Sequence, residues 1–340
     1  MKLSVNIPSY SRPEVLNNCL VHLSNQTIKH DVEILIGLDG PAELTPDPVV
    51  PKSIQAYTSI TRFPKNGHIP IRNALLQQSQ GDISLSMNDD SYASPDLFAT
   101  HIAMHEMGIR VVSGKSTWKI ISSPTMFDRF IQESDLLFFE QDEITSPVRT
   151  HYRNCFGLNM SFPRMLAVEL GGFPEMVNCY GHEDIELAYR LEQAGAELWY
   201  QPQASVVHDH RYLPDDVLRR EYQLGRASRK YAEYNPSFAI DLLKRDLLDP
   251  ETIRYFVQTL KHEQRDAIRI EQSFRALSEA PPNEHDLANP RVLQLLEEHW
   301  VLLKRYLWRW GVVDSSYGLE PRWSLVKELE FVETEFCNVH

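Results

Sequence analysis

Cysteine is scarce in this chain, and the cysteines that occur do not cluster. Cys19, Cys155, Cys179 and Cys337 lie far apart without any CxxC pair, so the sequence predicts neither a disulfide framework nor a zinc knuckle. No apolar run approaches the roughly 20 residues that span a bilayer. The first residues, "MKLSVNIPSY", contain no apolar signal-peptide core. We therefore expect a reduced, cytoplasmic setting and no transmembrane segment.

Basic residues are also in deficit, because 34 Lys and Arg face 47 Asp and Glu, a formal net charge of −13. Proteins that coat nucleic acids need basic patches for the phosphates, so we expect no nucleic-acid partner. Glycine is missing where two nucleotide-binding classes need it. No GxGxxG follows a strand, which argues against a nicotinamide oxidoreductase, and "PSYSRP" after the first strand lacks the glycines of a sugar-1-phosphate nucleotidyltransferase.

What the chain does contain is an alternation of apolar strands and amphipathic helices near its N-terminus. Its 340 residues are 42% hydrophobic and 24% charged, an ordinary composition for a folded protein with a sizeable core. The expected elements are strands at Leu3–Ile7, Val32–Leu38 and Ile83–Met87, and helices at 13–23 and 71–79. This order predicts an α/β fold with a mainly parallel sheet. From residue 212 the sequence is rich in charged residues, has few strand patterns and shows helical periodicity. We therefore expect an α/β domain at 1–211 and a helical extension at 212–340.

Polar residues end three of these segments. Ser9–Arg12 follow the first strand, Asp39 the second, and Asn88–Asp90 the third. Ligands of open α/β sheets bind beyond the carboxyl ends of the strands. These three ends are therefore expected to line one crevice.

Two later stretches also carry candidate chemistry. Glu183 and Asp184 begin a helix, where acidic residues are favoured by the macrodipole alone, but the preceding Gly181 allows a ligand to approach the backbone closely. "ASVVHDH" ends a strand in His208 and His210, which point the same way because they alternate. A structural role and a metal site both remain open for them, and a nitrogen/oxygen site with the acidic residues near Asp90 suits Mn²⁺ better than Ca²⁺.

These stretches together resemble the GT-A-fold glycosyltransferases, in particular the inverting nucleotide-sugar transferases of family 2. The resemblance covers roughly 1–211 and rests on the order of motifs: "IPSYSRP", "LDG", "KNGHIPIRN", "GDISLSMNDD", "GLNMSF", Gly171–Phe173, Glu183-Asp184 and "VVHDH". The Gly-His-Glu-Asp segment also looks like the acceptor region of β-1,4-galactosyltransferase relatives. This sequence departs from the family at Ser11, where Asn is usual, and at Asn88, the first position of Asp-x-Asp.

The resemblance implies a cation, Mn²⁺ or Mg²⁺, between the donor diphosphate and the protein. Asp90 and His208 would be its ligands, with His210 and Asn88 as weaker candidates, and Asp89 would face the ribose or the donor sugar. Asp184 would be the base that deprotonates the acceptor, with Glu183 and Gly181 beside the acceptor. The remaining implied donor-site residues are Pro8, Tyr10, Arg12, Asp39, Asn66 and Arg72.

The expected function is an inverting, metal-dependent transfer of a sugar, with UDP as the expected carrier, to an acceptor hydroxyl. The acceptor class stays open between a glycan, a lipid-linked sugar, a peptide and a small molecule. The alternative is a degenerate relative that binds sugars or acts as a scaffold, which Asn88 keeps open. Trp118 either stacks on a sugar or belongs to the core. The aromatic and basic run His299–Val313 either packs on the protein, in a homo-oligomer or within the chain, or contacts a membrane surface.

Overall fold

The computed structural model describes residues 1–28, 31–134, 136–137, 139, 144–175, 179–279 and 290–322. Contacts divide the chain into two compact units. Unit 1 comprises Met1–Ile120, Phe139–Asn178 and His182–His210; unit 2 comprises Ile121–Phe138, Cys179–Gly181 and Arg211–His340. Residues 280–289 and 323–340 of the expected helical extension lie outside the described residues. The predicted boundary between residues 211 and 212 stays a prediction, since two short segments before it also group with unit 2.

Unit 1 is built on one nine-stranded sheet in the order β3-β2-β1-β4-β8-β6-β9-β5, with β7 paired to β9. The strands are β1 (Leu3–Ser9), β2 (Val32–Asp39), β3 (Thr58–Phe63), β4 (Ile83–Met87), β5 (Ser91–Ala93), β6 (Val111–Trp118), β7 (Val148–Arg149), β8 (Asn159–Pro163) and β9 (Leu198–His208). Strands β1 to β4, β6 and β9 run in one direction, and β5, β7 and β8 run opposite. The predicted α/β class with a mainly parallel sheet is confirmed.

The central strands are apolar because helices cover both faces of the sheet. On one face, β1 and α1 (Pro13–Ser24) share a core with α3 (Leu97–Glu106), in which Leu20 and Phe98 are buried. On the other face, Leu35 of β2 packs against Ile71 and Leu75 of α2. The three predicted strands are confirmed, and β1 and β2 reach Ser9 and Asp39.

The helix predicted from residue 71 begins earlier, because α2 spans His68–Gln78. Gly67 precedes it with φ +87°, a left-handed conformation that suits glycine and lets the chain turn directly into the helix. Pro70 falls in the first turn, where its missing N–H costs nothing. The remaining helical elements of unit 1 are α5 (Arg164–Glu169), α6 (Glu183–Gln193) and the short 3₁₀ turns η1 (Gln55–Tyr57) and η2 (Tyr152–Asn154).

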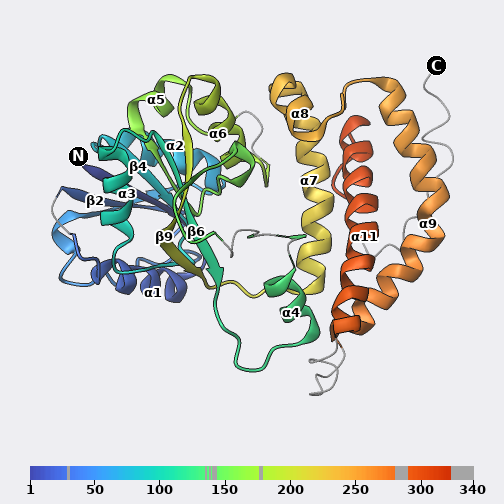
Figure 1. Cartoon of the computed structure of the whole chain (residues 1–340), viewed down its shortest axis with the longest axis horizontal. Helices are drawn as coiled ribbons and strands as arrows, with labels where there is room; N and C mark the ends of the chain where they lie inside the picture. Colours follow the sequence, from blue (N-terminus) through green and yellow to red (C-terminus); the bar gives the residue numbers. More distant parts are fainter. Residues whose placement is uncertain are drawn as a thin grey trace. The chain divides into compact units, whose positions relative to one another are not determined.

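The described residues of unit 2 form the helices α4 (Met126–Glu133), α7 (Pro214–Tyr234), α8 (Pro236–Leu243), α9 (Pro250–Glu279) and α11 (Pro290–Ser316). Helix α11 packs against both α7 and α9 (Figure 1). Helices α11 and α7 approach closely at Gly225 and Gly311. Glycine is needed at both positions, because a Cβ there would collide with the backbone of the facing helix. Trp300 and Trp310 of the aromatic run are 0% and 1% exposed, so packing within unit 2 accounts for them.

Among the described residues, no helix is both long enough and apolar enough to span a bilayer. Membrane contact and oligomer contact of the aromatic run stay predictions.

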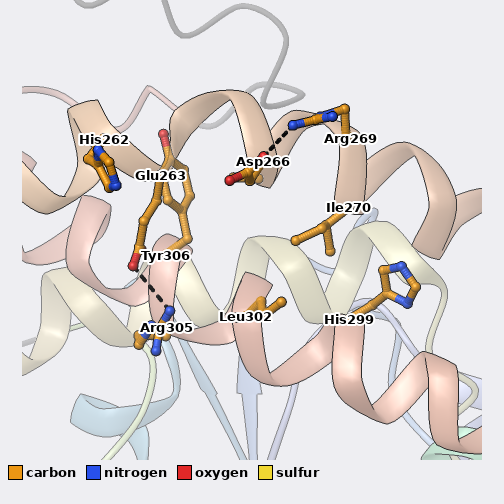
Figure 2. A pocket seen from close by; sticks show the side chains of 10 residues that line it. His262, Glu263, Asp266, Arg269, Ile270, His299, Leu302, Arg305 and Tyr306 are labelled. Atoms are coloured by element: carbon orange, nitrogen blue, oxygen red, sulfur yellow. Dashed lines mark hydrogen bonds and ion pairs between the residues drawn. The ribbon is translucent and has the colours of Figure 1, made fainter.

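A pocket of about 640 Å³ lies on unit 2 between α9 and α11. Figure 2 shows side chains of the two helices facing it, with Glu263 bonded to Arg305 and Asp266 to Arg269. None of the site residues expected from the sequence lines this pocket.

Candidate active site

The polar ends of β1, β2 and β4 lie side by side, as the sequence predicts. β1 pairs in parallel with β2 on one side and with β4 on the other, so Ser9, Asp39 and Asn88 share one edge of the sheet. Ser9 Oγ donates a hydrogen bond of 2.6 Å to Asp89 Oδ2, which joins the first end to the third. The three ends therefore form one polar site.

The acidic pair at the end of β4 is buried and faces Arg12. Asp89 and Asp90 are 1% and 3% exposed. Arg12 Nη1 donates to Asp90 Oδ2 at 2.7 Å, and Arg12 Nη2 donates to Asp89 Oδ1. One guanidinium thus pairs with both carboxylates, which explains how two adjacent acids are tolerated at a buried strand end. The sequence assigned Arg12 to the donor site but did not reveal this pairing.

The second partner of Asp90 is the end of β9. His208 pairs with Ser91 in the β5–β9 ladder, and the Asp209 N–H donates to the Asp90 carbonyl at 2.8 Å. This backbone pairing places His208 Nε2 3.3 Å from Asp90 Oδ1 and His210 Nδ1 3.7 Å from Asp90 Oδ2. The two imidazoles stack with centroids 5.7 Å apart.

Asp209, between the two histidines, is turned away from the acidic pair. Its Oδ2 accepts hydrogen bonds from Tyr92 Oη at 2.6 Å and Lys119 Nζ at 2.8 Å. Alternate strand positions therefore separate the two imidazoles from the intervening carboxylate, as the pattern predicts.

Two buried atoms of these residues have no hydrogen-bond partner among the described residues, namely Asp90 Oδ1 and His208 Nδ1, the ring nitrogen other than the one that faces Asp90. Asp90 Oδ1 lies at ion-pair distance from His208 Nε2 without the geometry of a hydrogen bond. A buried acceptor without a donor is costly. One carboxylate oxygen and one imidazole nitrogen are ligands that Mn²⁺ accepts, and Mg²⁺ is commonly held by one or two carboxylates plus substrate phosphates. These residues fit a cation on those terms.

Within the described part of the chain, no three His, Cys, Asp or Glu side chains converge as a metal-binding group. Asn88 Oδ1 accepts a 2.6 Å hydrogen bond from Arg72 Nη2, and its role as a weaker metal ligand stays a prediction. A cation at Asp90 and His208 would therefore take its further ligands from a bound diphosphate or from water.

The pKa values of Asp89 and Asp90 are shifted in opposite directions by burial and by the neighbouring charges. Burial raises the pKa of Asp89 to about 6, and the charge of Arg12 offsets this only in part. Burial acts in the same sense on Asp90, but contacts with His208 and His210 and the charge of Arg12 outweigh it. The pKa of Asp90 therefore lies well below its usual range.

Arg72 is buried beside Asn88. Its Nη2 donates to Asn88, and its Nη1 donates to Ser86 Oγ and, at 3.3 Å, to the Gly157 carbonyl. Its side chain is 6% exposed and its guanidinium lies 5.5 Å from the centroid of the Phe173 ring. Burial lowers the pKa of Arg72, while the surrounding carboxylates oppose this. The alternative that Arg72 is a solvated helix residue does not hold.

Asp39 serves the chain's own backbone. Its Oδ1 accepts the Asn66 N–H at 2.8 Å and its Oδ2 the Gly67 N–H at 3.2 Å. These bonds fix the turn into α2, which gives Asp39 a structural role in addition to the one expected with the donor. A contact of either Asp39 or Asn66 with the donor stays a prediction.

Tyr10 stands at the open side of the site and is 38% exposed. Its hydroxyl accepts a 2.9 Å bond from Lys65 Nζ, which lies 4.6 Å from the ring centroid. Next to it Ser11 has φ +55°, a left-handed conformation in which Asn is enriched. Pro8 lies within β1 and pairs with Gly37 of β2.

Glu183 and Asp184 open α6 beneath the loop that follows η2. Asp184 Oδ2 accepts the Gly157 N–H at 2.8 Å, and Asp184 Oδ1 accepts the Ile185 N–H at the same distance. Glu183 Oε1 lies 2.8 Å from His68 Nε2. Their neighbour His182 has φ +70°, a strained conformation for a residue with a side chain, at the start of the helix.

The paired acids of α6 divide their protons unequally. Burial raises the pKa of Asp184, and the charge of Glu183 raises it further, to about 6. Burial also acts against ionised Glu183, but its contact with His68 outweighs this and lowers the pKa of Glu183 to about 2. A carboxylate with a pKa near neutrality is suited to accept a proton.

Gly181 is explained by packing. It has φ +98°, and a Cβ at this position would collide with Leu224 of α7 in unit 2. A glycine is required here whether or not an acceptor is bound, so its expected acceptor role stays a prediction.

Sequence reasoning missed His68, Gly157 and the contact made by Ser9. His68 lies in "KNGHIPIRN", the segment whose Asn66 and Arg72 the resemblance assigns to the donor site. Trp118 pairs with His208 across β6 and β9, and its ring centroid lies 5.2 Å from that of His208. Trp118 therefore flanks the imidazole expected to bind a cation.

Two protein families match the chain. Residues 4–161 match glycosyl transferase family 2, and residues 144–211 match the N-terminal domain of galactosyltransferase. The chain is 26% identical over 309 residues to the uncharacterized glycosyltransferase YfnE of Bacillus subtilis (strain 168), covering 73% of this chain and 78% of that protein. A 61-residue match, 43% identical, joins 18% of this chain to 13% of the pre-mycofactocin glycosyltransferase of Mycobacterium tuberculosis (strain CDC 1551 / Oshkosh).

Among solved structures, the chain is similar to the mannosyltransferase PcManGT from Pyrobaculum calidifontis in complex with GDP-Man and Mn²⁺. The TM-score is 0.56 at 16% identity, over 94% of this chain and 88% of that chain. This likeness establishes the GT-A fold.

Proposed function

The chain is a glycosyltransferase of the family 2 type with a GT-A fold, and we propose that it is inverting and metal-dependent. It would move a sugar from a nucleoside-diphosphate sugar to an acceptor hydroxyl. The observation that carries the proposal is the buried contact of Asp90 with His208, in which Asp90 Oδ1 has no hydrogen-bond donor among the described residues. The similarity to a mannosyltransferase in complex with GDP-Man and Mn²⁺ supports a cation and a nucleotide-sugar.

Asp90 and His208 would hold Mn²⁺ or Mg²⁺, which would neutralise the charge that develops on the departing nucleoside diphosphate. Arg12 would support the same step from the protein side. Its guanidinium pairs with Asp89 and Asp90. The Arg12 side chain as a whole is 38% exposed, so a phosphate can reach it. Asp89, whose Oδ2 is bonded to Ser9, would orient the ribose or the donor sugar.

Asp184 would accept the proton of the acceptor hydroxyl as that oxygen attacks the anomeric carbon. Attack from the face opposite to the leaving diphosphate inverts the configuration. The backbone N–H groups of Gly157 and Ile185 hold both carboxylate oxygens in place, which fixes the direction from which the proton is taken. Glu183 would orient the acceptor beside it.

The remaining expected residues would complete the donor pocket. Tyr10 would line the nucleoside, and Asp39 and Asn66 would stand at the base, as the resemblance implies. Arg72 is held by hydrogen bonds to Ser86, Asn88 and Gly157, and it would contribute a fixed positive charge to the site. We take UDP as the carrier to test first and GDP as the second.

The test is release of nucleotide from a panel of UDP-, GDP- and dTDP-sugars with Mn²⁺, with Mg²⁺ and with chelator. Asp90→Asn should abolish the metal-dependent part of nucleotide binding, measured by calorimetry. Asp209→Asn is the matched control, because Asp209 is next to His208 in sequence but faces Tyr92 and Lys119. Equal loss in both variants, or metal-independent binding in the wild type, would contradict the proposal.

A scaffolding relative is favoured by one observation, because Arg12 already pairs with one oxygen of each acid and Arg72 hydrogen-bonds Asn88. It predicts that the wild-type chain binds no nucleotide in a metal-linked manner and hydrolyses none of the donors.

A further inference from the structure

His68 is placed beside the acids of α6 by the turn that Asp39 builds. The Asp39 carboxylate holds the N–H groups of Asn66 and Gly67, and α2 begins at the next residue. This puts His68 Nε2 2.8 Å from Glu183 Oε1. The contact joins residues far apart in the chain, and nothing in the proposed reaction yet uses it.

Glu183 and Asp184 are consecutive, half-buried carboxylates, so each makes ionisation of the other harder. The charge of Arg72 in α2 attracts both carboxylates. The described hydrogen bonds of Arg72, however, go to Ser86, Asn88 and Gly157. Burial raises the pKa of the Cys155 thiol and the charge of Asp184 raises it further, so this thiol stays neutral and adds no negative charge beside the pair. Among these groups, His68 is the one that meets a carboxylate oxygen of Glu183 directly.

We propose that His68 is a positioning residue that keeps Glu183 ionised and oriented, so that Glu183 and Asp184 carry their charges together at neutral pH. The proposal rests on the proposed function insofar as Asp184 is the base. Its physical content is separate from activity, since it concerns the protonation of two named carboxyl groups.

Glu183 and Asp184 share one final proton, and the pH at which it leaves depends on how well the doubly ionised state is stabilised. A donor at Glu183 stabilises the state in which both groups are ionised. Removing that donor weakens the stabilisation of the doubly ionised state, so the last proton is released at higher pH. A larger fraction of Asp184 is then protonated at neutral pH, and that fraction is unable to accept the proton of the acceptor.

The direct experiment is a ¹³C NMR titration of the carboxyl resonances of Glu183 and Asp184 in the full chain. His68→Leu removes the donor. His68→Gln keeps an N–H donor near the position of Nε2 in place of the imidazole, and it serves as the test where His68→Leu does not fold. His262→Leu, an exposed histidine of α9 in unit 2, is the matched control.

In the wild type we expect the last proton of the pair to leave at about pH 6. His68→Leu should move this step upward by about one pH unit, His68→Gln by less, and His262→Leu not at all. A titration in both His68 variants that coincides with the wild type would overturn the proposal.

The acidic limb of the kcat/KM profile provides the second measurement. It should move with the carboxyl titration in His68→Leu, and the rate should recover above the shifted limb. A uniform loss of rate at every pH, with an unmoved limb and an unshifted carboxyl titration, would show a merely structural role for His68. A shifted titration with no turnover by the wild type, or with a limb that does not follow it, would refute Asp184 as the base and leave the role of His68 standing.

Discussion

Replacing Arg12 by Gln tests how the acidic end of β4 is stabilised. Arg12 pairs with Asp89 and Asp90, which are 1% and 3% exposed. Removing one partner of a fully buried ion pair costs about 3–5 kcal/mol. The Arg12 side chain is 38% exposed, so water screens part of this interaction. We therefore expect Arg12→Gln to lower the free energy of unfolding of unit 1 by about 2 kcal/mol without metal.

Mn²⁺ should then stabilise the variant more than the wild type. The guanidinium and a cation at Asp90 repel each other, so loss of Arg12 leaves the acids more attractive to metal. A tenfold gain in affinity adds about 1.4 kcal/mol of stabilisation at saturating metal.

Urea unfolding followed by hydrogen-exchange mass spectrometry on peptides that contain β4 measures this for unit 1 separately. Arg149→Gln is the control, because Arg149 and Glu197 form an exposed pair that contributes about 0–1 kcal/mol. Equal stability of Arg12→Gln and the wild type, or equal stabilisation of both by Mn²⁺, would refute the reasoning.

Three further predictions concern catalysis, donor binding and acid stability. Asp184→Asn should abolish transfer while nucleotide affinity stays within about twofold, since the base acts on the acceptor; near-normal turnover would show that the base lies elsewhere. Asp90→Ala should weaken nucleoside-diphosphate binding at least about tenfold with Mn²⁺ and little in chelator, and calorimetry that finds equal losses would move the cation site. His105→Gln should reduce the loss of stability below pH 6.5, measured by urea unfolding at pH 7 and pH 5. Burial lowers the pKa of His105 to about 3, so its unfolded form binds the proton first and stability falls by about 1.4 kcal/mol per pH unit. An unchanged acid dependence would contradict this.

The fold and the location of the site were predictable because both depend on local patterns. Alternating apolar positions marked β4, and the carboxyl ends of β1, β2 and β4 meet because the strands are parallel neighbours. The position of Asp184 at a helix start was also readable from its order along the chain.

The pairings within the site were not predictable, since they join residues far apart in sequence. Arg12 meets Asp89 and Asp90 only because β1 and β4 are adjacent, and His68 meets Glu183 only because α2 begins at the Asp39 turn. Hydrophobic periodicity carries no information on such polar contacts. It also gave no sign that α4 groups with the helices of unit 2.

The central claim is that one cation joins Asp90 and His208 to the donor diphosphate. A crystal grown with UDP and Mn²⁺ and measured at the manganese absorption edge tests it most directly. We predict an anomalous peak at ligand distance from Asp90 Oδ1 and His208, with the diphosphate on its other side. A manganese peak bound elsewhere, or bound UDP with Arg12 still paired to both carboxylates and no peak beside them, would contradict the account.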